Sequence, residues 1–160
     1  MGGFHVHILY SLESIMGTSE PKSVTTLNRM LQGELSAVAT YDLAITHLKN
    51  EVVSELGQNR ECHAGRVQAL TKRITELGGI PVMKSGIWVE FTKIVERGAA
   101  LISSDTVLAA LEQGEDFGLK QYREDLEDLD PKSRTLIDTD LRIAQDRTHA
   151  RLRDLELARK

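Results

Sequence analysis

Two glutamates occupy equivalent places in two helical patterns of this chain of 160 residues. The first pattern starts at Leu27, advances by four and three residues in turn to Leu48, and passes through Glu34 and Tyr41. This spacing is typical of the inward seam of a helix in a bundle. A carboxylate in a bundle core is strongly destabilised unless a cation, a metal ion or a proton compensates it. Glu34 therefore predicts a site with a positive partner.

The same pattern recurs in the second half of the chain. It starts at Leu108, ends at Leu129, and passes through Glu112, Glu115 and Tyr122. A repeat that includes polar positions indicates an internal duplication and a pseudo-twofold bundle. Each half is then expected to contribute one glutamate and one tyrosine to a shared interior, where each tyrosine hydroxyl donates to a neighbouring carboxylate.

The last helical pattern contains Asp146 and His149 at a spacing that suits a pair of metal ligands. The apolar stripe of this helix points Gln145 and Thr148 inward and turns Asp146 and His149 about 100° further round. A one-residue shift or a distortion of the helix would bring them into the interior. The stripe consists of Ile137, Leu141, Ala144, Leu152 and Leu155.

These patterns support a metal site. A four-helix bundle with inward carboxylates and Glu-x-x-His pairs holds two iron or manganese ions in known proteins. The second helix departs from this pattern, because it has His63-x-x-Arg66 in place of Glu-x-x-His. The candidate metal ligands are Glu34, His63, Glu115, Asp146 and His149.

The alternative is a buried network that neutralises itself without metal. Arg60 lies one turn before His63 on the predicted seam of the second helix, and Arg66 lies close by. The charged groups of this network are Arg60, His63, Glu34, Glu112 and Glu115.

The elements that must position these residues are all helical. The first two seams lie close together in the sequence and predict an antiparallel hairpin. Gly78 to Pro81 ends the second helix, and a connection of about 25 residues follows, long enough to carry the chain back along the bundle. It is expected to contain a short helix, with Trp88 largely buried and Phe91 a packing group. Asp105 is expected near the N-cap of the third helix.

The predicted fold is an all-α, ferritin-like four-helix bundle of two antiparallel hairpins joined by this crossover. The first helix is expected to begin after Pro21, with Ser23, Thr25 or Thr26 as its N-cap, and to end at about Leu48 or Asn50. We assign residues 1–22 to a flexible N-terminal extension and residues 23–160 to the bundle domain.

Composition narrows the functional classes. Aromatic residues are 4% of the chain, which favours a helical bundle, and the net charge of −4 is spread over interspersed residues. We therefore expect no nucleic-acid partner. The single cysteine excludes an internal disulfide, and the sequence contains no apolar run long enough to span a membrane. A cytoplasmic protein is the expectation.

Several stretches resemble known ferritin-like families. The first helix looks like that of bacterioferritins, and later stretches are similar to a bacterial ferritin-like four-helix family of unassigned function. The resemblance implies the fold, and it matches Glu34 and Glu115 to carboxylate ligands while His63 and Arg66 stand where bacterioferritin has Glu and His. It rests on Leu27-Asn28-x-x-Leu31-x-x-Glu34-Leu35-x-Ala37-x-x-x-Tyr41, Leu77-Gly78-Gly79-x-Pro81, Glu112-x-Gly114-Glu115-Asp116 and His149-x-x-Leu152-x-x-Leu155.

Two functional classes follow from these features. Arg66 in place of a metal ligand favours a non-enzymatic interaction or stress-related module with a salt-bridged core. The alternative is a metal-binding protein or oxidase of the di-iron or di-manganese type. A second apolar edge on the last helix predicts a homodimer; it consists of Leu136, Ile143, Ala150 and Leu157.

Overall fold

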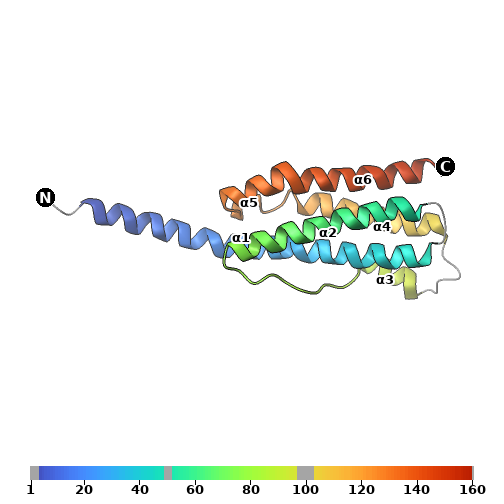
Figure 1. Ribbon diagram of the computed structural model, residues 1–160, viewed down its shortest axis with the longest axis horizontal. Helices are drawn as coiled ribbons and strands as arrows, with labels where there is room; N and C mark the ends of the chain where they lie inside the picture. The colour runs from blue at the N-terminus through green and yellow to red at the C-terminus, as the bar shows by residue number, and fades with distance from the viewer. Residues whose placement is uncertain (1–3, 49–51, 97–102, 160) are drawn as a thin grey trace.

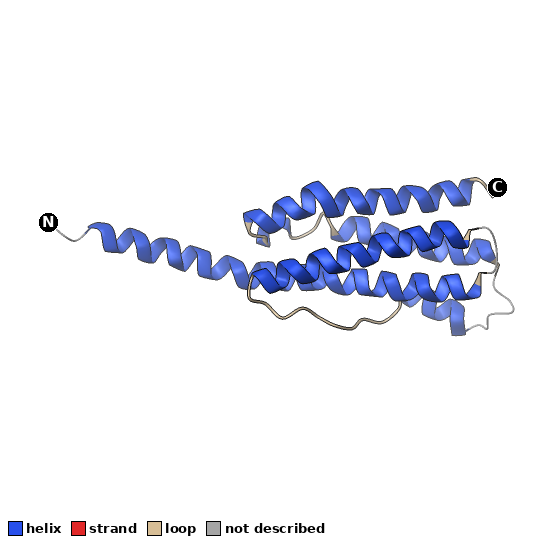
Figure 2. Cartoon of the chain, in the orientation of Figure 1, coloured by secondary structure: helices blue, strands red, loops and turns tan. Residues whose placement is uncertain are grey.

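The computed structural model describes residues 4–48, 52–96 and 103–159. Within these ranges every regular element is a helix and no strand occurs, so the all-α prediction is confirmed for the described residues (Figure 2). The elements are α1 (Phe4–His47), α2 (Val53–Glu76), α3 (Val89–Glu96), α4 (Ser104–Gln121), a 3₁₀ turn (Leu126–Asp128), α5 (Pro131–Leu136), a π-helical turn (Ile137–Leu141) and α6 (Arg142–Leu157).

Four long helical segments lie side by side in Figure 1: α1, α2, α4 and the run from α5 through α6. α1 and α2 run in opposite directions, and so do α4 and α6. Residues 79–88 have no regular structure and carry the chain back along the molecule before α3 and α4. α2 and α4 therefore run in the same direction, which agrees with the predicted crossover.

The start of α1 differs from the prediction. The helix begins at Phe4 and continues through Pro21, so the N-cap predicted at Ser23, Thr25 or Thr26 is wrong. Pro21 has no amide proton, and the helix tolerates the loss of one backbone hydrogen bond there. Figure 1 shows the first turns of α1 extending beyond the other helices. The assignment of residues 1–22 to a flexible extension stays a prediction.

Ser23 has a tertiary role in place of the predicted cap. Its side chain is fully buried, and its hydroxyl donates to the carbonyl of Asp128 at 3.1 Å. The same hydroxyl accepts the amide of Asp130 at 2.7 Å. Ser23 thus ties the middle of α1 to the turn that enters α5.

Two other boundaries lie close to the predicted ones, whereas α4 ends at Gln121 and not near Leu129, where its seam was expected to end. Gly78 has φ of +72°, a left-handed conformation that favours glycine, and its amide donates to the carbonyl of Thr75 at 2.9 Å. The predicted end of α2 is confirmed. Ser103, two residues before the predicted Asp105, caps α4 by accepting the amide of Thr106 at 3.2 Å. The predicted stop at Asn50 lies outside the described residues.

The core consists of two apolar clusters with a polar layer between them. One cluster gathers around Leu56, Leu108 and Leu152, and the other around Leu31, Leu70 and Ile137. Both include buried residues of α1 and α2, which lie along the full length of the core. Any polar side chain in the layer between the clusters is therefore shielded from water on both sides.

The crossover segment covers one side of this core. α3 confirms the predicted short helix, and Phe91 is buried against the first cluster. Trp88 has intermediate exposure and packs against the same cluster, which agrees with the prediction that its side chain is largely buried. Its amide donates to Thr40 Oγ1 at 3.0 Å, which fixes the end of the extended segment on α1.

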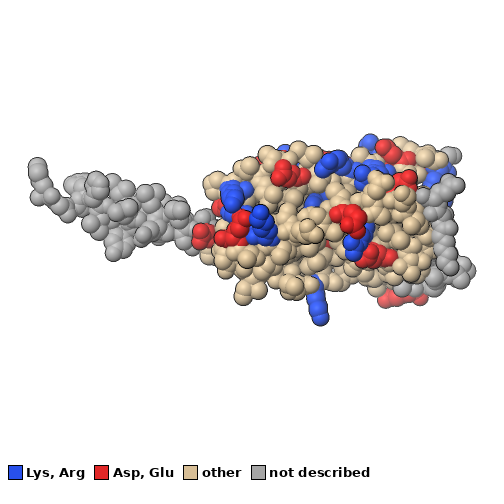
Figure 3. Space-filling view, viewed as in Figure 1, with Lys and Arg blue, Asp and Glu red and all other residues tan. Residues whose placement is uncertain are grey.

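The surface carries charges of both signs. On the face drawn in Figure 3, Lys and Arg side chains alternate with Asp and Glu. Such a mixture is typical of a solvated surface without a large field of one sign. Among the described helices, none combines the length and the apolar character needed to cross a membrane. The absence of a nucleic-acid partner and a cytoplasmic location stay predictions.

The end of α2 provides a test of the packing. A Cβ at Gly79 would lie 2.7 Å from Val24 Cγ1 and 3.0 Å from Ile74 Cγ2, whereas a Cβ at Gly65 has nothing within 4 Å. We expect Gly79→Ala to lower the free energy of unfolding by about 1–3 kcal/mol because it overpacks the core. Gly65→Ala should raise it by about 0.5–1 kcal/mol through better helix propensity.

Urea denaturation of both variants beside the wild type measures these changes. Equal stability of Gly79→Ala and wild type would show that the contact between the end of α2 and Val24 is looser than described.

Candidate functional site

The polar layer brings together charged residues from three helices. Glu34 comes from α1, His63 and Arg66 from α2, and Glu115 from α4. Their exposed fractions are 4%, 2%, 2% and 0%. The structure therefore places three of the five predicted site residues in one buried cluster, together with the arginine.

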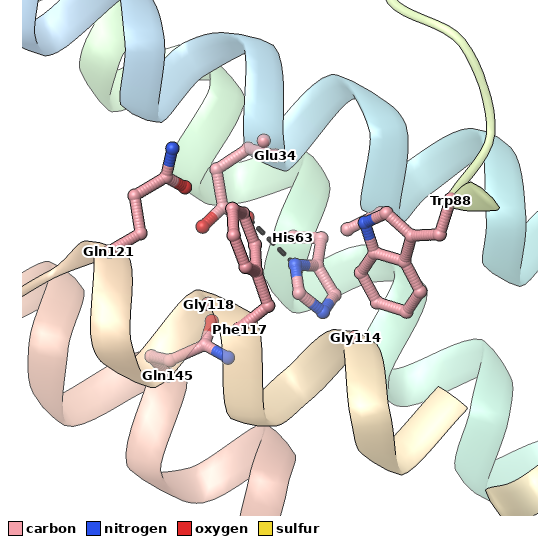
Figure 4. Close-up of a pocket in the computed structure, with 10 residues that line it drawn as sticks. Glu34, His63, Trp88, Gly114, Phe117, Gly118, Gln121 and Gln145 are labelled. Atoms are coloured by element: carbon pink, nitrogen blue, oxygen red, sulfur yellow. Dashed lines mark hydrogen bonds and ion pairs between the residues drawn. The ribbon is translucent and has the colours of Figure 1, made fainter. Parts of the chain in front are cut away.

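His63 bridges the two glutamates. Its Nδ1 lies 2.7 Å from Glu34 Oε2 (Figure 4). Its Nε2 lies 3.0 Å from Glu115 Oε1. Both ring nitrogens can donate only when the ring carries two protons. The imidazolium form is thus the one that satisfies both carboxylates.

Arg66 supplies the second cationic group. Its Nε lies 3.0 Å from Glu34 Oε1, which is close enough for an ion pair but is not aligned as a hydrogen bond. Its Nη2 donates to Gln145 Oε1 at 2.8 Å and lies 2.6 Å from His63 Nδ1. Two cations are thus in contact, and the adjacent carboxylates offset their repulsion.

The two tyrosines confirm the prediction that each hydroxyl donates to a buried carboxylate. Tyr41 donates to Glu115 Oε1 at 2.6 Å, and Tyr122 donates to Glu34 Oε1 at 2.6 Å. Each tyrosine therefore bonds the glutamate of the other repeat. This crosswise pairing joins the first and second halves of the chain at the centre of the core.

α6 completes the hydrogen bonding of Glu115. Gln145 Nε2 donates to Glu115 Oε2 at 2.7 Å, and the Thr148 hydroxyl donates to the same oxygen at 2.8 Å. These are the two residues that the apolar stripe of this helix points inward. Both oxygens of Glu115 are thus occupied by donors from α1, α2 and α6.

Asn59 belongs to the network and was not predicted. Its Nδ2 donates to Tyr41 Oη and to the carbonyl of Thr148, each at 3.0 Å. Asn59 lies four residues before His63, and a search at the true helical period of 3.6 residues would have included it.

The charges keep the cluster ionised. Burial alone would raise the pKa of Glu34, but the positive charges of His63 and Arg66 outweigh it and lower that pKa. Burial would also raise the pKa of Glu115, and hydrogen bonds from His63, Tyr41 and Thr148, with the charge of His63, lower it instead. Burial would lower the pKa of His63, and the two glutamates raise it.

The pKa values of the two tyrosines are raised, in contrast to those of the two glutamates. Burial and the neighbouring Glu115 carboxylate raise the pKa of Tyr41 well above its usual value. Burial and Glu34 have the same effect on the pKa of Tyr122. Both phenols therefore remain neutral donors. Two anions and two cations balance in the interior.

Asp146 and His149 lie outside the cluster. Asp146 is exposed, and His149 is partly buried with its Nε2 2.8 Å from Asp116 Oδ1. The helix does contain a distortion before these residues, the π-helical turn (Ile137–Leu141). Gln145 and Thr148 nevertheless face inward after this turn, so Asp146 and His149 are not brought to Glu34.

The prediction that Arg60 and Glu112 belong to the buried network is wrong. Arg60 faces outward, where its Nε lies 2.9 Å from Asp42 Oδ1 and its Nη1 lies 2.9 Å from Glu61 Oε1. Glu112 is only partly buried and is not among the residues that contact His63. The seam read at alternating threes and fours matches the buried face at His63 but is one residue late on either side of it, where Asn59 and Arg66 are buried.

The donor set does not fit a two-metal centre. The Arg66 guanidinium has no lone pair for a metal and occupies the space beside Glu34. Both nitrogens of His63 are engaged by carboxylates. Across the described residues, no group of three or more His, Cys, Asp or Glu side chains is arranged to hold a metal ion.

A narrow pocket reaches this cluster from the surface. It is lined by Glu34 and His63 at its inner end and by Trp88 and Phe117 nearer the surface (Figure 4). Its volume of about 10 Å³ has room for one water molecule. The buried charges are thus close to solvent along one path.

Comparison with protein families assigns the chain to a group. Residues 22–128 match the family described as a domain of unknown function, DUF2383. The chain belongs to the DUF2383 family. Comparisons with curated proteins and with solved structures gave no match. The predicted membership of a helical family of unassigned function is supported, whereas the link to bacterioferritin stays a prediction.

The DUF2383 match contains most of the cluster. Glu34, His63, Arg66 and Glu115 all lie inside it, together with both tyrosines. Gln145 lies beyond residue 128, as does Thr148. The family match thus supplies the charged groups, and the last helix of this chain adds neutral donors.

The pKa shifts predict how stability depends on pH. The raised pKa of His63 stabilises the fold fully below its usual value of 6.5, and this contribution is lost as the pH rises through the folded-state pKa. The lowered pKa of Glu34 stabilises the fold above its usual value of 4.5, and this contribution is lost at lower pH. We expect wild-type stability to fall above pH 6.5, by at most about 1.4 kcal/mol per pH unit from this group.

His63→Gln should be less stable overall and should lack this alkaline decline. His149→Gln is the matched surface control and should keep it. Urea denaturation of all three proteins at a series of pH values measures the effect. An alkaline decline that persists in His63→Gln would assign it to another group.

Proposed function

We propose that this DUF2383 domain is a ferritin-like four-helix bundle in which protein cations take the place of a metal centre. On this proposal the domain serves as a non-enzymatic interaction or stress-related module. The observation that carries it is the position of His63 and Arg66, which together neutralise Glu34 and Glu115 in the core. The polar layer then specifies how the four helices pair and does no chemistry.

The chain path supports the ferritin-like part of the proposal. α2 and α4 run in the same direction and are joined by a long crossover with the short helix α3 (Figure 1). The crosswise pairs Tyr41 with Glu115 and Tyr122 with Glu34 agree with two repeats around one interior. In ferritin-like bundles this interior is where carboxylates face each other.

The hydrogen bonding supports a structural role for the carboxylates. Glu115 accepts from Tyr41, His63, Gln145 and Thr148, and these four bonds fill the acceptor capacity of a carboxylate. A ligand or metal ion at Glu115 would have to displace one of these donors. Such displacement would leave a buried polar group unpaired, which costs about 1–3 kcal/mol.

A metal-handling protein or a di-iron or di-manganese oxidase is the competing proposal. One observation favours it: Glu34, His63 and Glu115 already contact one another in a buried layer. It requires Arg66 to withdraw and His63 to lose a proton, and Asp146 and His149 to move inward if they are to take part. The two proposals differ in how the core responds to loss of a carboxylate and to chelators.

The proposed core predicts a specific pattern of stability. Glu34→Gln should lower the free energy of unfolding by about 3–5 kcal/mol, because it leaves Arg66 buried without its counter-ion. Arg66→Met should also destabilise, and the double variant should be more stable than the sum of the two single changes implies. Asp42→Asn, at the exposed partner of Arg60, should change stability by less than about 1 kcal/mol. Urea denaturation measures all four variants.

Metal content gives the second arm of this test. Protein purified without a histidine tag and then exposed to iron, manganese or zinc in air should retain no stoichiometric metal. Its melting temperature should be the same with and without a chelator. Stoichiometric metal, with a melting temperature that falls on chelation in the wild type and not in Glu34→Gln, would replace this proposal with the metal-handling one.

A homodimer is the interaction that we propose for the outer edge of α6. Ile143 and Leu157 are 50% and 59% exposed, and Leu136 and Ala150 are partly buried beside them. Exposed apolar side chains along one helix are suited to a twofold contact. Light scattering at high micromolar protein should give twice the chain mass for the wild type and the monomer mass for Ile143→Lys with Leu157→Lys. A monomeric wild type would contradict the proposal.

A further inference from the structure

A groove of about 410 Å³ lies between the crossover segment and α4. Its apolar walls come from Ile87, Trp88, Ala110 and Phe117, and its volume is in the range of small-molecule sites. Phe117 is 60% exposed at the rim, although a large aromatic side chain on a helix surface is usually covered. The groove is thus an apolar hollow with aromatic side chains on two sides.

The floor of the groove depends on a glycine. A Cβ at Gly114 would overlap the indole ring of Trp88, so the ring rests directly on the backbone of α4. Gly114 precedes Glu115, and the position of the indole is therefore set by the same helical turn that holds the buried carboxylate. The shape of the groove follows from this contact.

Trp88 connects the groove to the buried cluster. Its ring centroid lies 6.1 Å from that of Tyr41 and 6.5 Å from that of His63, both edge to face. The narrow pocket that ends at Glu34 shares Trp88, Gly114 and Phe117 with the groove. In Figure 4, Phe117 and Trp88 flank the way to Glu34 and His63. A molecule in the groove would therefore lie next to the narrow pocket that leads to Glu34 and His63.

We propose that this groove binds a small, neutral, planar aromatic molecule that carries a hydroxyl group, that is, a phenol. Its ring lies between Trp88 and Phe117, and its hydroxyl points into the narrow pocket and donates toward Glu34. The proposal does not rest on the absence of metal from the core or on the interaction role proposed above. The proposed site shares Glu34 with the buried cluster, and its other contacts are with side chains that neither of these uses.

The chemistry of the lining selects this class of ligand. Among the described residues that line the groove no side chain is charged, and the polar ones are Ser36 and Gln113. A charged ligand would lose its hydration there without an ionic partner, whereas a neutral ring gains aromatic contacts on both sides. The narrow pocket has space for one oxygen atom, and the Glu34 carboxylate accepts hydrogen bonds.

The chain carries its own probe, because Trp88 is its single tryptophan. Phenol is titrated into the full chain, and Trp88 emission is followed with excitation at the long-wavelength edge, where phenol does not absorb. We expect a saturable change in emission. Benzoate, a charged relative of similar size, and cyclohexanol, which lacks a planar ring, should bind at least about tenfold more weakly, since each loses one of the two contributions.

Two variants locate the site. Gly114→Ala should weaken phenol binding by at least about tenfold because it displaces the indole, and Phe117→Ala should weaken it by about tenfold through loss of one aromatic face. Gly57→Ala is the matched control, since a Cβ there has nothing within 4 Å, and it should leave binding unchanged. Phe117→Ala changes an exposed side chain, so it tests the site even if Gly114→Ala does not fold.

Three outcomes would overturn the proposal. The first is no saturable response to phenol, and the second is equal affinity for phenol, benzoate and cyclohexanol. The third is a dimeric wild type that Phe117→Ala converts to a monomer while phenol has no effect, which would assign the groove to a second copy of the chain.

Discussion

The burial of two carboxylates is the constraint on which the rest of the structure depends. Glu34 and Glu115 lie between two apolar clusters, where an unpaired charge would cost more free energy than a typical domain has to spare. His63 and Arg66 on α2 meet this cost, because His63 contacts both carboxylates and Arg66 forms a second ion pair with Glu34. The relative rotation of α1, α2 and α4 is therefore restricted to arrangements that keep these four groups in contact, a restriction that apolar packing alone does not impose.

The neutral donors refine this arrangement. Gln145 links Arg66 to Glu115, so α6 is attached to both charged partners through a neutral side chain. Arg151 and the carbonyl of Thr148 hold Asn59, which in turn supports the Tyr41 hydroxyl. The network thus has a charged centre and a border that is neutral apart from Arg151. The border fixes the rotamers of the centre, which is the usual role of residues around a buried polar group.

Sequence patterns predicted the centre of this network and missed parts of its border. Glu34, Tyr41, Glu115 and Tyr122 were found because the duplicated seam repeats polar residues as well as leucines. The seam of α2 was less accurate: counting by threes and fours averages 3.5 residues per turn, whereas a straight helix has 3.6, and the error places Arg60 inward and misses Asn59. The same drift explains why Ala37 and Ala44 are buried more deeply than Val38 and Ile45. The role of Ser23 depends on Asp128 and Asp130, which are distant in sequence, so a local pattern assigned it to a helix cap.

The crosswise tyrosine pairs have a consequence for folding. The hairpin of α1 and α2 contains Glu34 and Tyr41, but the hydroxyl that Glu34 accepts belongs to Tyr122, and the carboxylate that Tyr41 needs belongs to Glu115. Neither hairpin can satisfy its own buried polar groups, so each would be an unstable fragment by itself. The two repeats, although similar in sequence, are therefore expected to form one cooperative folding unit and to lack the independence of duplicated domains.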